Sequence, residues 1–390
     1  MPEVKPDIET FAKIKVVGIG GSGNSAINRM VSGKIKGVNF LAINTDVQAL
    51  HFSRANKKIN IGKQITRGLG AGMDPELGKK AAEENQNEIR DALKDVDMVF
   101  ITCGLGGGTG SGASPIVAQI AKDSGALTVG VVTKPFAFEG VQRKEIAEKA
   151  HRELAEVVDT IITIPNDRIL QVIDKKTSLL DAFDIVDDVL RQGVQGISEL
   201  ITIPGLINVD FADVKTIMQD AGTALMGIGK GSGEKRAEEA AKAAIQSPLL
   251  ETSIDGAKGI LFSITGGSDL GMNEVSEAAK IITQNADSDA KVIFGTVIDE
   301  SLKDQILITV IATGFGTKKA LPPKNNGYGF YANSVNKQEA DIKKTAETSK
   351  INEMEIPTII RKAEENKIDG EEEDDDVDEL EIPAFLRKKM

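Results

Sequence analysis

Short apolar runs alternate with amphipathic helical patterns in the first half of the chain. Five runs rich in Val, Ile and Thr have the length of buried strands, KIKVVGI (13–19), VNFLAIN (38–44), VDMVFIT (96–102), ALTVGVVT (126–133) and DTIITI (159–164). Helical patterns fall between several of them, at 24–33, 74–95, 114–125 and 138–158. This alternation predicts an α/β fold with a Rossmann-like parallel sheet covered on both faces.

Turn and capping residues set the predicted ends of two of these helices. Asp74 and Pro75 open the 74–95 helix as N-cap and first-turn proline. Ser114-Pro115 opens the next helix, which closes at Gly125.

A long central helix and a second α/β unit follow. The helix is predicted over 178–201, where apolar residues recur at helical spacing, and Pro204-Gly205 ends it. Further helices are predicted at 211–220, 233–246 and 273–285, and strands at 224–229, 258–265, 291–298 and 305–312. A short polar connection joins the last two strands, which predicts a hairpin in a mixed sheet.

The pattern ends at about residue 317. The remainder is polar and contains the acidic run EEEDDDVDELE (371–381), a composition typical of disordered linkers. Two similar peptides occur within it, EIPTIIRK (355–362) and EIPAFLRK (381–388). A short apolar-basic motif of this kind is typical of a peptide ligand, and chance similarity in a biased tail is the alternative.

Composition excludes several classes of protein. The single cysteine, Cys103, cannot form an internal disulfide, and one Cys with two His cannot build a Cys/His zinc site. No apolar run is long enough to span a membrane and the N-terminus lacks a signal-peptide pattern, so we expect a cytoplasmic protein. The net charge of −12 argues against nucleic acid as the main ligand.

The chain contains 39 glycines, and two dense clusters of them follow predicted strands. In GIGGSGNSAINRM (18–30), Gly18, Gly20 and Gly23 match G-x-G-x-x-G between a strand and a helix. Asp46 follows the second strand, where a dinucleotide fold places a ribose-binding acid. This loop alone would fit NAD or FAD as well as any other nucleotide.

The second glycine cluster, GLGGGTGSGA (104–113), favours a polyphosphate ligand over NAD or FAD. Two glycine loops at the carboxyl ends of strands predict one polyphosphate held by both, although the glycines could merely form tight turns. The chain has no G-x-x-x-x-G-K-[ST] motif. We therefore expect backbone N–H groups, the hydroxyls of Thr109 and Ser111 and a cation such as Mg²⁺ to hold the phosphates.

These loops occur with further motifs, NTD (44–46), GAGMDPE (70–76), PFAFEG (135–140), IPNDRI (164–169) and NVDFADVK (208–215). Together with GGGTGSG they make the chain resemble the tubulin/FtsZ family of GTPases, in its bacterial cell-division branch. The resemblance covers about 13–315, and EIPAFLRKK looks like that branch's C-terminal peptide. It implies a GTPase that polymerises head to tail into protofilaments of the cytokinetic (Z) ring, at mid-cell beneath the membrane.

The resemblance divides the chain into six parts. They are a flexible segment (1–12), a GTP-binding domain (13–177), a central helix (178–203), a C-terminal α/β domain (204–316), a disordered acidic linker (317–380) and a partner-binding peptide (381–390).

The resemblance also implies a set of nucleotide-binding residues. They are Gly20, Gly21, Ser22, Gly23, Asn24, Ser25, Ala71, Gly72, Gly104, Gly107, Gly108, Thr109, Gly110, Glu139, Arg143, Asn166, Phe183 and Asp187. Ser22 stands where Gly is usual. Ala71 and Gly72 would lie near the γ-phosphate, and Glu139 and Arg143 would hold the ribose and phosphate edge or simply form an exposed ion pair.

Guanine offers two adjacent donors, N1–H and N2–H₂, which one carboxylate can accept together. Asp187 matches the family's base-reading acid, with the adjacent Asp188 as the alternative. Phe183 would stack on the base or pack in the core, and Asn166 would donate to guanine O6 or contact the ribose.

Asp210 and Asp213 are the candidate catalytic acids, assisted by Asn208. Acids at a helix start are often ordinary caps. In this family, however, the loop reaches the nucleotide of the next subunit, where the two acids would orient the attacking water.

The resemblance implies Mg²⁺ bound mainly through phosphates and water, with K⁺ as a second candidate and no protein metal site. Partners would be other copies of the chain, division regulators, and membrane-tethering division proteins such as FtsA. The tail residues for the tethering partners are Glu381, Ile382, Pro383, Phe385, Leu386 and Arg387. An NAD- or FAD-dependent oxidoreductase and a non-hydrolysing scaffold are the alternative functions.

Overall fold

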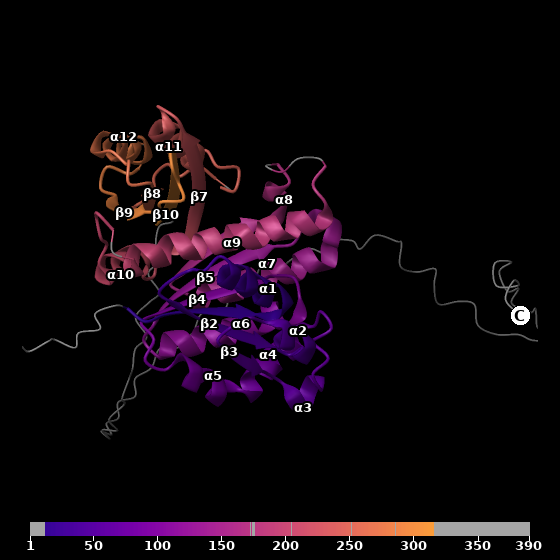
Figure 1. The fold of residues 1–390 in the computed structure, drawn as a ribbon. Helices are drawn as coiled ribbons and strands as arrows, with labels where there is room; N and C mark the ends of the chain where they lie inside the picture. The colour runs from indigo at the N-terminus through magenta and orange to yellow at the C-terminus, as the bar shows by residue number, and fades with distance from the viewer. Residues whose placement is uncertain are drawn as a thin grey trace, which may run out of the picture. The chain divides into compact units, whose positions relative to one another are not determined.

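One ten-stranded sheet organises the part of the chain that the computed structural model describes, which is residues 12–171, 173, 176–203, 205–250, 252–284 and 286–315 (Figure 1). Its strands are β1 (Ile14–Ile19), β2 (Val38–Asn44), β3 (Lys57–Asn60), β4 (Met98–Gly104), β5 (Leu127–Lys134), β6 (Thr160–Pro165), β7 (Gly222–Ser232), β8 (Gly259–Gly266), β9 (Lys291–Ile298) and β10 (Gln305–Thr313). They lie in the order β3-β2-β1-β4-β5-β6-β7-β10-β8-β9. All pairings are parallel except those of β10, which is antiparallel to both its neighbours.

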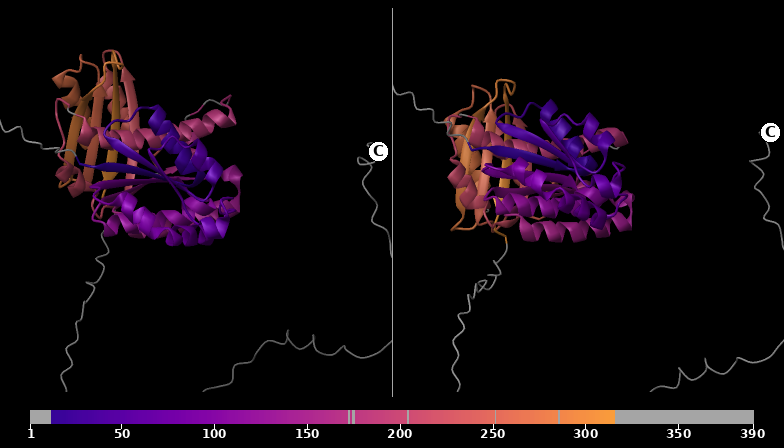
Figure 2. Two further views of the ribbon diagram at one scale, coloured as in Figure 1. Left: turned by 60° about the horizontal axis from the view of Figure 1, so that its bottom comes forward. Right: turned by 90° about the horizontal axis from the view of Figure 1, so that it is seen from below.

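Helices cover both faces of this sheet (Figure 2). They are α1 (Gly20–Ser32), α2 (Val47–Phe52), α3 (Lys63–Thr66), α4 (Pro75–Glu84), α5 (Gln86–Leu93), α6 (Gly108–Asp123), α7 (Val141–Val157), α8 (Asn166–Ile169), α9 (Leu179–Thr202), α10 (Phe211–Met218), α11 (Arg236–Ile245) and α12 (Met272–Thr283), with a short 3₁₀ helix, η1 (Ala137–Glu139). Within the described ranges, none of these helices has the length and apolar character needed to cross a membrane.

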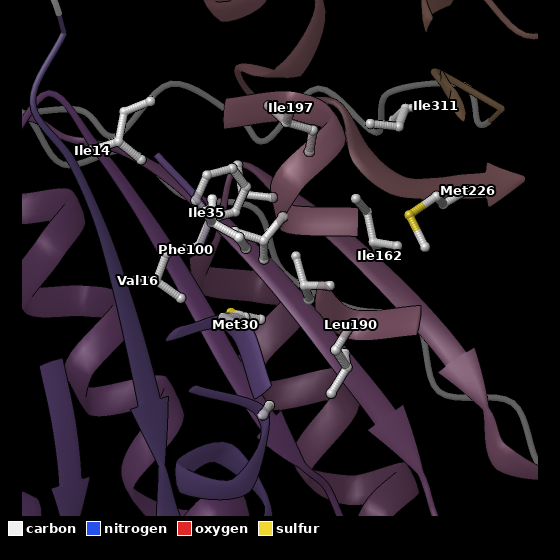
Figure 3. Close-up of a cluster of buried hydrophobic side chains, with 14 of the residues drawn as sticks. Ile14, Val16, Met30, Ile35, Phe100, Ile162, Leu190, Ile197, Met226 and Ile311 are labelled. Atoms are coloured by element: carbon white, nitrogen blue, oxygen red, sulfur yellow. The ribbon is translucent and has the colours of Figure 1, made fainter. Parts of the chain in front are cut away.

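The predicted α/β class is confirmed, and helix α9 joins its two halves. Its buried stripe packs in one cluster with α1, β1 and β4 of the first half and with α10, β7 and β10 of the second. Figure 3 shows Leu190 and Ile197 of α9 among Ile14, Phe100 and Met226 from these strands. By contrast, the edge between β6 and β7 is short, with three paired residues on each strand. The burial of apolar side chains along α9 therefore contributes much of the free energy that holds the two halves together.

Two other clusters cover the remaining sheet faces. Helices α4, α5, α6 and α7 pack on the face of the first half opposite α1 and α9. Helices α11 and α12 pack against β7, β8 and β10 in the second half. Both faces of the sheet are therefore buried, which accounts for the continuous apolar runs of the strands.

The predicted hairpin of the last two strands is wrong. β10 inserts between β7 and β8, while β9 pairs with the far side of β8 in parallel. Most of β10 is buried, whereas β9 is exposed at its first residues and at its last. The more buried strand, β10, is thus central, and the more exposed strand, β9, forms the edge. Burial of apolar side chains, and not proximity in sequence, decides the pairing.

Three predicted helices also have different bounds. The helix expected at 24–33 begins four residues earlier, at Gly20. The helix expected at 114–125 begins six residues earlier, at Gly108, so Pro115 lies inside it. The helix expected at 74–95 is divided into α4 and α5 at Asn85, whose side-chain oxygen accepts a hydrogen bond from Gly62 N at 2.9 Å. Strand β3 and the short helices α2 and α3 were not predicted.

Glycines recur at every second position of β7, at Gly227, Gly229 and Gly231, where α11 lies against the strand backbone. A Cβ atom at each of these positions would lie 2.0 Å from a carbonyl oxygen of α11. Part of the glycine excess therefore serves helix–sheet packing and not the phosphate loops.

We expect Gly229→Ala to lower the free energy of unfolding by about 3 kcal/mol, because its Cβ would overlap backbone atoms of Ala240 and Ala244. Urea unfolding followed by circular dichroism measures this change. Lys230→Ala is the matched control, since Lys230 is the exposed neighbour on the same strand and its loss should cost no more than about 0.5 kcal/mol. Equal effects of the two substitutions would contradict this packing account.

Candidate functional site

A cavity of about 320 Å³ opens where β1, β4, β5 and β6 reach their carboxyl ends. Ligands of open α/β sheets bind at this edge. The predicted residues that line it are Gly21, Ser22, Ala71, Gly104, Gly107, Gly108, Thr109, Gly110, Glu139, Arg143, Asn166, Phe183 and Asp187. The structure thus brings both glycine loops and the start of α9 to one place.

Two helices begin at this cavity, and neither is capped by a side chain. The N-cap residues Ile19 of α1 and Gly107 of α6 make no side-chain capping bond, and neither helix has an acid in its first turn. The first N–H groups of both helices therefore remain available, with the positive ends of both helix dipoles nearby. This combination favours a bound anion.

The first three amides of the second glycine loop are already occupied. Gly104 N donates to Ser22 Oγ at 2.8 Å, Leu105 N to the Thr133 carbonyl at 2.9 Å, and Gly106 N to Ser111 Oγ at 2.9 Å. Free amides for a ligand are therefore expected from Gly107 onward. Ser111 is buried and does not line the cavity, in contrast to the expectation that its hydroxyl holds a phosphate.

The loop before α4 is tightly packed against the start of α6. A Cβ at Gly108 would lie 2.8 Å from Asp74 N and 2.9 Å from the Ala71 Cβ. Ala71 lines the cavity and Gly72 does not. Any displacement of this loop by a ligand is consequently transmitted to the α6 N-terminus, because no space separates them.

Four other predicted residues, Gly20, Gly23, Asn24 and Ser25, also lie outside the cavity lining. Gly20 has φ +74°, and a Cβ there would lie 2.9 Å from Gly110 N, so the two loops touch at this glycine. Asn24 is buried and, in the amide orientation that satisfies its neighbours, donates to the carbonyl oxygens of Gly18 and Gly20. Gly20 and Asn24 thus shape the loop backbone.

Gly23 and Ser25 differ in what surrounds them. A Cβ at Gly23 would lie 2.5 Å from the Thr102 carbonyl oxygen, so this glycine lets α1 approach β4. Ser25 lines a neighbouring open depression together with Arg29, Asp184 and Asp187.

One end of the cavity combines an aromatic ring, a carboxyl and an amide. The Phe183 ring meets Phe136 edge-on at 5.5 Å between centroids. Burial and the nearby Asp184 carboxylate, opposed by Arg29, together raise the pKa of Asp187 to about 7. Asn166 is buried, and its Oδ1 has no hydrogen-bond partner among the described residues. An acceptor buried in this way calls for a donor from a ligand.

Asp187 and Asp188 have different surroundings. Asp188 does not line the cavity and is bound instead by Arg191 Nε at 2.7 Å and by Gln192 at 2.5 Å. These hydrogen bonds outweigh burial and hold the pKa of Asp188 below its usual value. Of the two acids left open by the sequence, Asp187 is the one that faces the cavity.

Glu139 and Arg143 form an ion pair at the cavity wall, four residues apart. Glu139 also accepts a hydrogen bond from Phe136 N at 2.9 Å, which fixes the turn before α7. The pair is thus both a structural contact and part of the lining.

The candidate catalytic residues Asn208, Asp210 and Asp213 do not line the cavity. All three are exposed at the start of α10, where Asp210 caps the helix by accepting from Ala212 N at 3.0 Å. Figure 1 shows α10 beside the C-terminal end of α9, whereas Phe183 and Asp187 belong to its first turns. At 1.5 Å per residue, α9 is about 36 Å long. The cavity extends along its first half to Leu190, and the acids lie beyond its C-terminal end.

The cavity also contains residues that were not predicted, namely Leu105, Thr133, Pro135, Val186 and Leu190. Thr133 and Pro135 follow a predicted strand, and that position could have indicated them. Val186 and Leu190 belong to the apolar stripe of α9, which by itself indicates only core. Among the described residues, no group of three or more His, Cys, Asp or Glu side chains is arranged to hold a metal ion.

Comparisons with known proteins agree with this arrangement. A family model described as "Tubulin/FtsZ family, GTPase domain" matches residues 13–174, and one described as "FtsZ family, C-terminal domain" matches 222–316. The structure of an FtsZ dimer from M. jannaschii is 48% identical over 78% of this chain and 89% of that chain, with a TM-score of 0.76. A point mutant of the same organism's FtsZ gives the same identity and TM-score, over 92% of that chain.

A more distant structure, CetZ2 from Haloferax volcanii in a GTPγS-bound protofilament, shares the fold. It is 22% identical over 77% of this chain and 92% of that chain, with a TM-score of 0.66. The match of 13–174 to a GTPase domain argues against the oxidoreductase alternative. The chain therefore belongs to the FtsZ family of tubulin-like GTPases.

Proposed function

We propose that this protein hydrolyses GTP only where two subunits meet, and that it polymerises head to tail into the protofilaments of a cytokinetic ring. The observation that carries the proposal is that the cavity lies along the first half of α9, whereas Asp210 and Asp213 lie beyond its C-terminal end. A site whose two parts lie at opposite ends of one subunit is completed by stacking a second subunit on the first. Such a heterologous contact need not close and so produces a filament.

Exposed apolar side chains at both ends support this contact. Near the cavity, Leu69, Phe138, Val141 and Leu180 are each more than half exposed, and each lies within three residues of a lining residue. Near Asn208, Leu206 is 73% exposed. Burying these side chains between subunits would stabilise the filament. The solved FtsZ relative is described as a dimer and the CetZ2 relative as a protofilament, which also supports self-association.

The phosphates of GTP would bind the free amides of α1 and of α6 from Gly107 onward. The cavity wall supplies backbone N–H groups and hydroxyls and no carboxylate cluster, which suits a polyanion that brings its own cation. Mg²⁺ would accordingly be held by phosphate oxygens and water, with K⁺ as a second candidate. The bound cation would neutralise charge on the phosphates during hydrolysis.

The guanine base would occupy the end formed by Phe183, Asp187 and Asn166. Ionised Asp187 can accept from N1–H and N2–H₂ together, and the unpartnered Asn166 Oδ1 can accept from the ribose or the base. The ring of Phe183, which is 40% exposed, offers a stacking surface. Adenine lacks this pair of donors, so the same carboxylate selects guanine.

Hydrolysis would use the acids of the next subunit. Asp210 and Asp213 lie three residues apart in the first turn of α10 and can act from one face on the water that attacks the γ-phosphate. Asn208 would help to position that water. Ala71 would respond to the presence of the γ-phosphate through its contact with the start of α6, together with the adjacent Gly72.

The C-terminal peptide, which lies outside the described residues, would connect the filament to the membrane. Its apolar-basic sequence, Glu381, Ile382, Pro383, Phe385, Leu386 and Arg387, fits a short ligand of a tethering protein such as FtsA. The similar segment 355–362 is a candidate second docking site. These contacts would hold the protein at the division site, on the cytoplasmic side of the membrane.

We expect GTP affinity to fall about tenfold per pH unit below pH 7 and to level off above it, because Asp187 must lose a proton to accept both guanine donors. Asp187→Asn should bind GTP at least about tenfold more weakly, with no such pH dependence between pH 5.5 and 8. Calorimetric titration with GTP measures both effects. Asp188→Asn is the control and should keep the wild-type profile, and a flat profile for the wild type would refute the role of Asp187.

Asp213→Ala should keep GTP affinity and lose about 10²-fold or more in turnover, because it removes a group that polarises the attacking water. Gly108→Ala should instead lose GTP binding, since its Cβ collides with the backbone of Asp74. A one-to-one mixture of the two variants should recover up to about a quarter of wild-type turnover. In random head-to-tail stacking, about a quarter of the contacts join the intact nucleotide site of Asp213→Ala to the intact acids of Gly108→Ala. Phosphate release under polymerising conditions measures this. Activity no higher than the sum of the separate variants would exclude a shared site.

Removal of 381–390 should leave GTP turnover unchanged and abolish binding to the tethering partner, because the deleted peptide lies outside the catalytic parts. Co-sedimentation with FtsA on vesicles measures the binding. Residual binding that disappears after further deletion of 355–362 would identify the second docking site. Full binding without either peptide would exclude the tail as the membrane link.

A further inference from the structure

Ser22 occupies an unusual place between the two glycine loops. It lies in the first turn of α1, lines the cavity, and accepts a hydrogen bond from Gly104 N at 2.8 Å. A Cβ at Gly104 would lie 2.6 Å from the Ser22 Oγ, so this contact requires glycine on the other side. The hydroxyl therefore joins the first loop to the second at the point where both face the cavity.

A serine hydroxyl has one hydrogen to donate in addition to the lone pairs with which it accepts. Among the described residues, Ser22 accepts from Gly104 N and makes no donated hydrogen bond. Its hydrogen is therefore available to a ligand in the cavity. Donation from the Gly104 amide polarises the hydroxyl, which strengthens it as a donor.

The amides of the second glycine loop next to Ser22 and the Thr109 hydroxyl already have hydrogen-bond partners among the described residues. The Gly104 amide is occupied, and the Leu105 and Gly106 amides are engaged by the Thr133 carbonyl and by Ser111. Thr109 Oγ1 is paired with Thr45 Oγ1 at 2.7 Å. Thr109 and Thr133 also line the cavity, and Ser22 is the hydroxyl of α1 that lines it with its hydrogen unassigned.

We propose that the Ser22 hydroxyl donates a hydrogen bond to a phosphate oxygen of the bound nucleotide. The same hydroxyl accepts from Gly104 N and so connects the two glycine loops while it binds the phosphate. This inference rests on the proposed function, because it assumes that GTP occupies the cavity. It adds a side-chain phosphate ligand at the position where Gly is usual, in a site otherwise built from backbone amides. A hydrogen bond to a charged oxygen is stronger than one between neutral groups.

The test compares the affinities of GTP, GDP and guanosine for the full chain and its variants by calorimetric titration. Ser22→Ala should weaken GTP and GDP by about tenfold and leave guanosine unchanged, because the lost bond is made only to phosphate. Ser22→Thr keeps the hydroxyl and should bind GTP within about twofold of the wild type. Ser32→Ala is the matched control, since Ser32 lies on the last turn of the same helix and donates to the Asn28 carbonyl at 2.8 Å.

Three results would overturn the proposal. They are an unchanged GTP affinity in Ser22→Ala, an equal loss for guanosine and GTP, and a loss in Ser22→Thr as large as that in Ser22→Ala. Failure of the proposed function has a different signature, because the wild type would then bind GTP no more tightly than guanosine or would not bind it at all.

Discussion

Binding of a polyanion by backbone is the constraint on which the rest of this structure depends. The amides that can bind phosphates lie at the uncapped starts of α1 and α6, and both starts must converge on one cavity. Convergence requires that loops pass within contact distance of one another, as at Gly20 and Gly108. An acidic protein can therefore hold phosphates, because the attracting groups are dipoles that add nothing to its net charge.

Helix α9 relates this site to the second half of the protein. Its first turns bring Phe183 and Asp187 to the cavity, and its buried stripe continues into the core shared with β7 and β10. The same helix thus fixes the Phe183–Asp187 end of the cavity and the position of α10. Because one helix spans the distance, a subunit cannot bring its own Asp210 to its own cavity without losing the packing of α9.

Charge at the Phe183–Asp187 end of the cavity is balanced differently from charge at the glycine-loop end. Asp187 is largely buried near Asp184, and both effects favour its neutral form despite Arg29. Asp188, one residue away, is stabilised as a carboxylate by Arg191 and Gln192. The pKa values of two adjacent acids of one helix are therefore shifted in opposite directions, because Asp187 lines the cavity near another carboxylate and Asp188 accepts hydrogen bonds from Arg191 and Gln192.

The sequence alone determined the alternation of strands and helices, the two glycine loops at strand ends and the family to which they belong. These features are local, since they depend on residue period, capping and spacing. It did not determine which of Asp187 and Asp188 faces the cavity, because adjacent positions on a helix differ only in what packs around them. Nor did it reveal that Ser111 is buried, or that Val186 and Leu190 reach the cavity from the apolar stripe of α9.

Tertiary structure alone decided the pairing of β10 between β7 and β8, the start of α6 at Gly108 and the placement of Asp210 far from the cavity of its own subunit. β9 and β10 are both apolar runs, and only competition for burial in the assembled sheet assigns one to the centre and one to the edge. Glycines at the start of α6 look like a loop when taken in isolation, and packing against the 71–74 loop makes them helical. The separation of the acids from the cavity likewise follows from the length and packing of α9, which no local pattern of residues specifies.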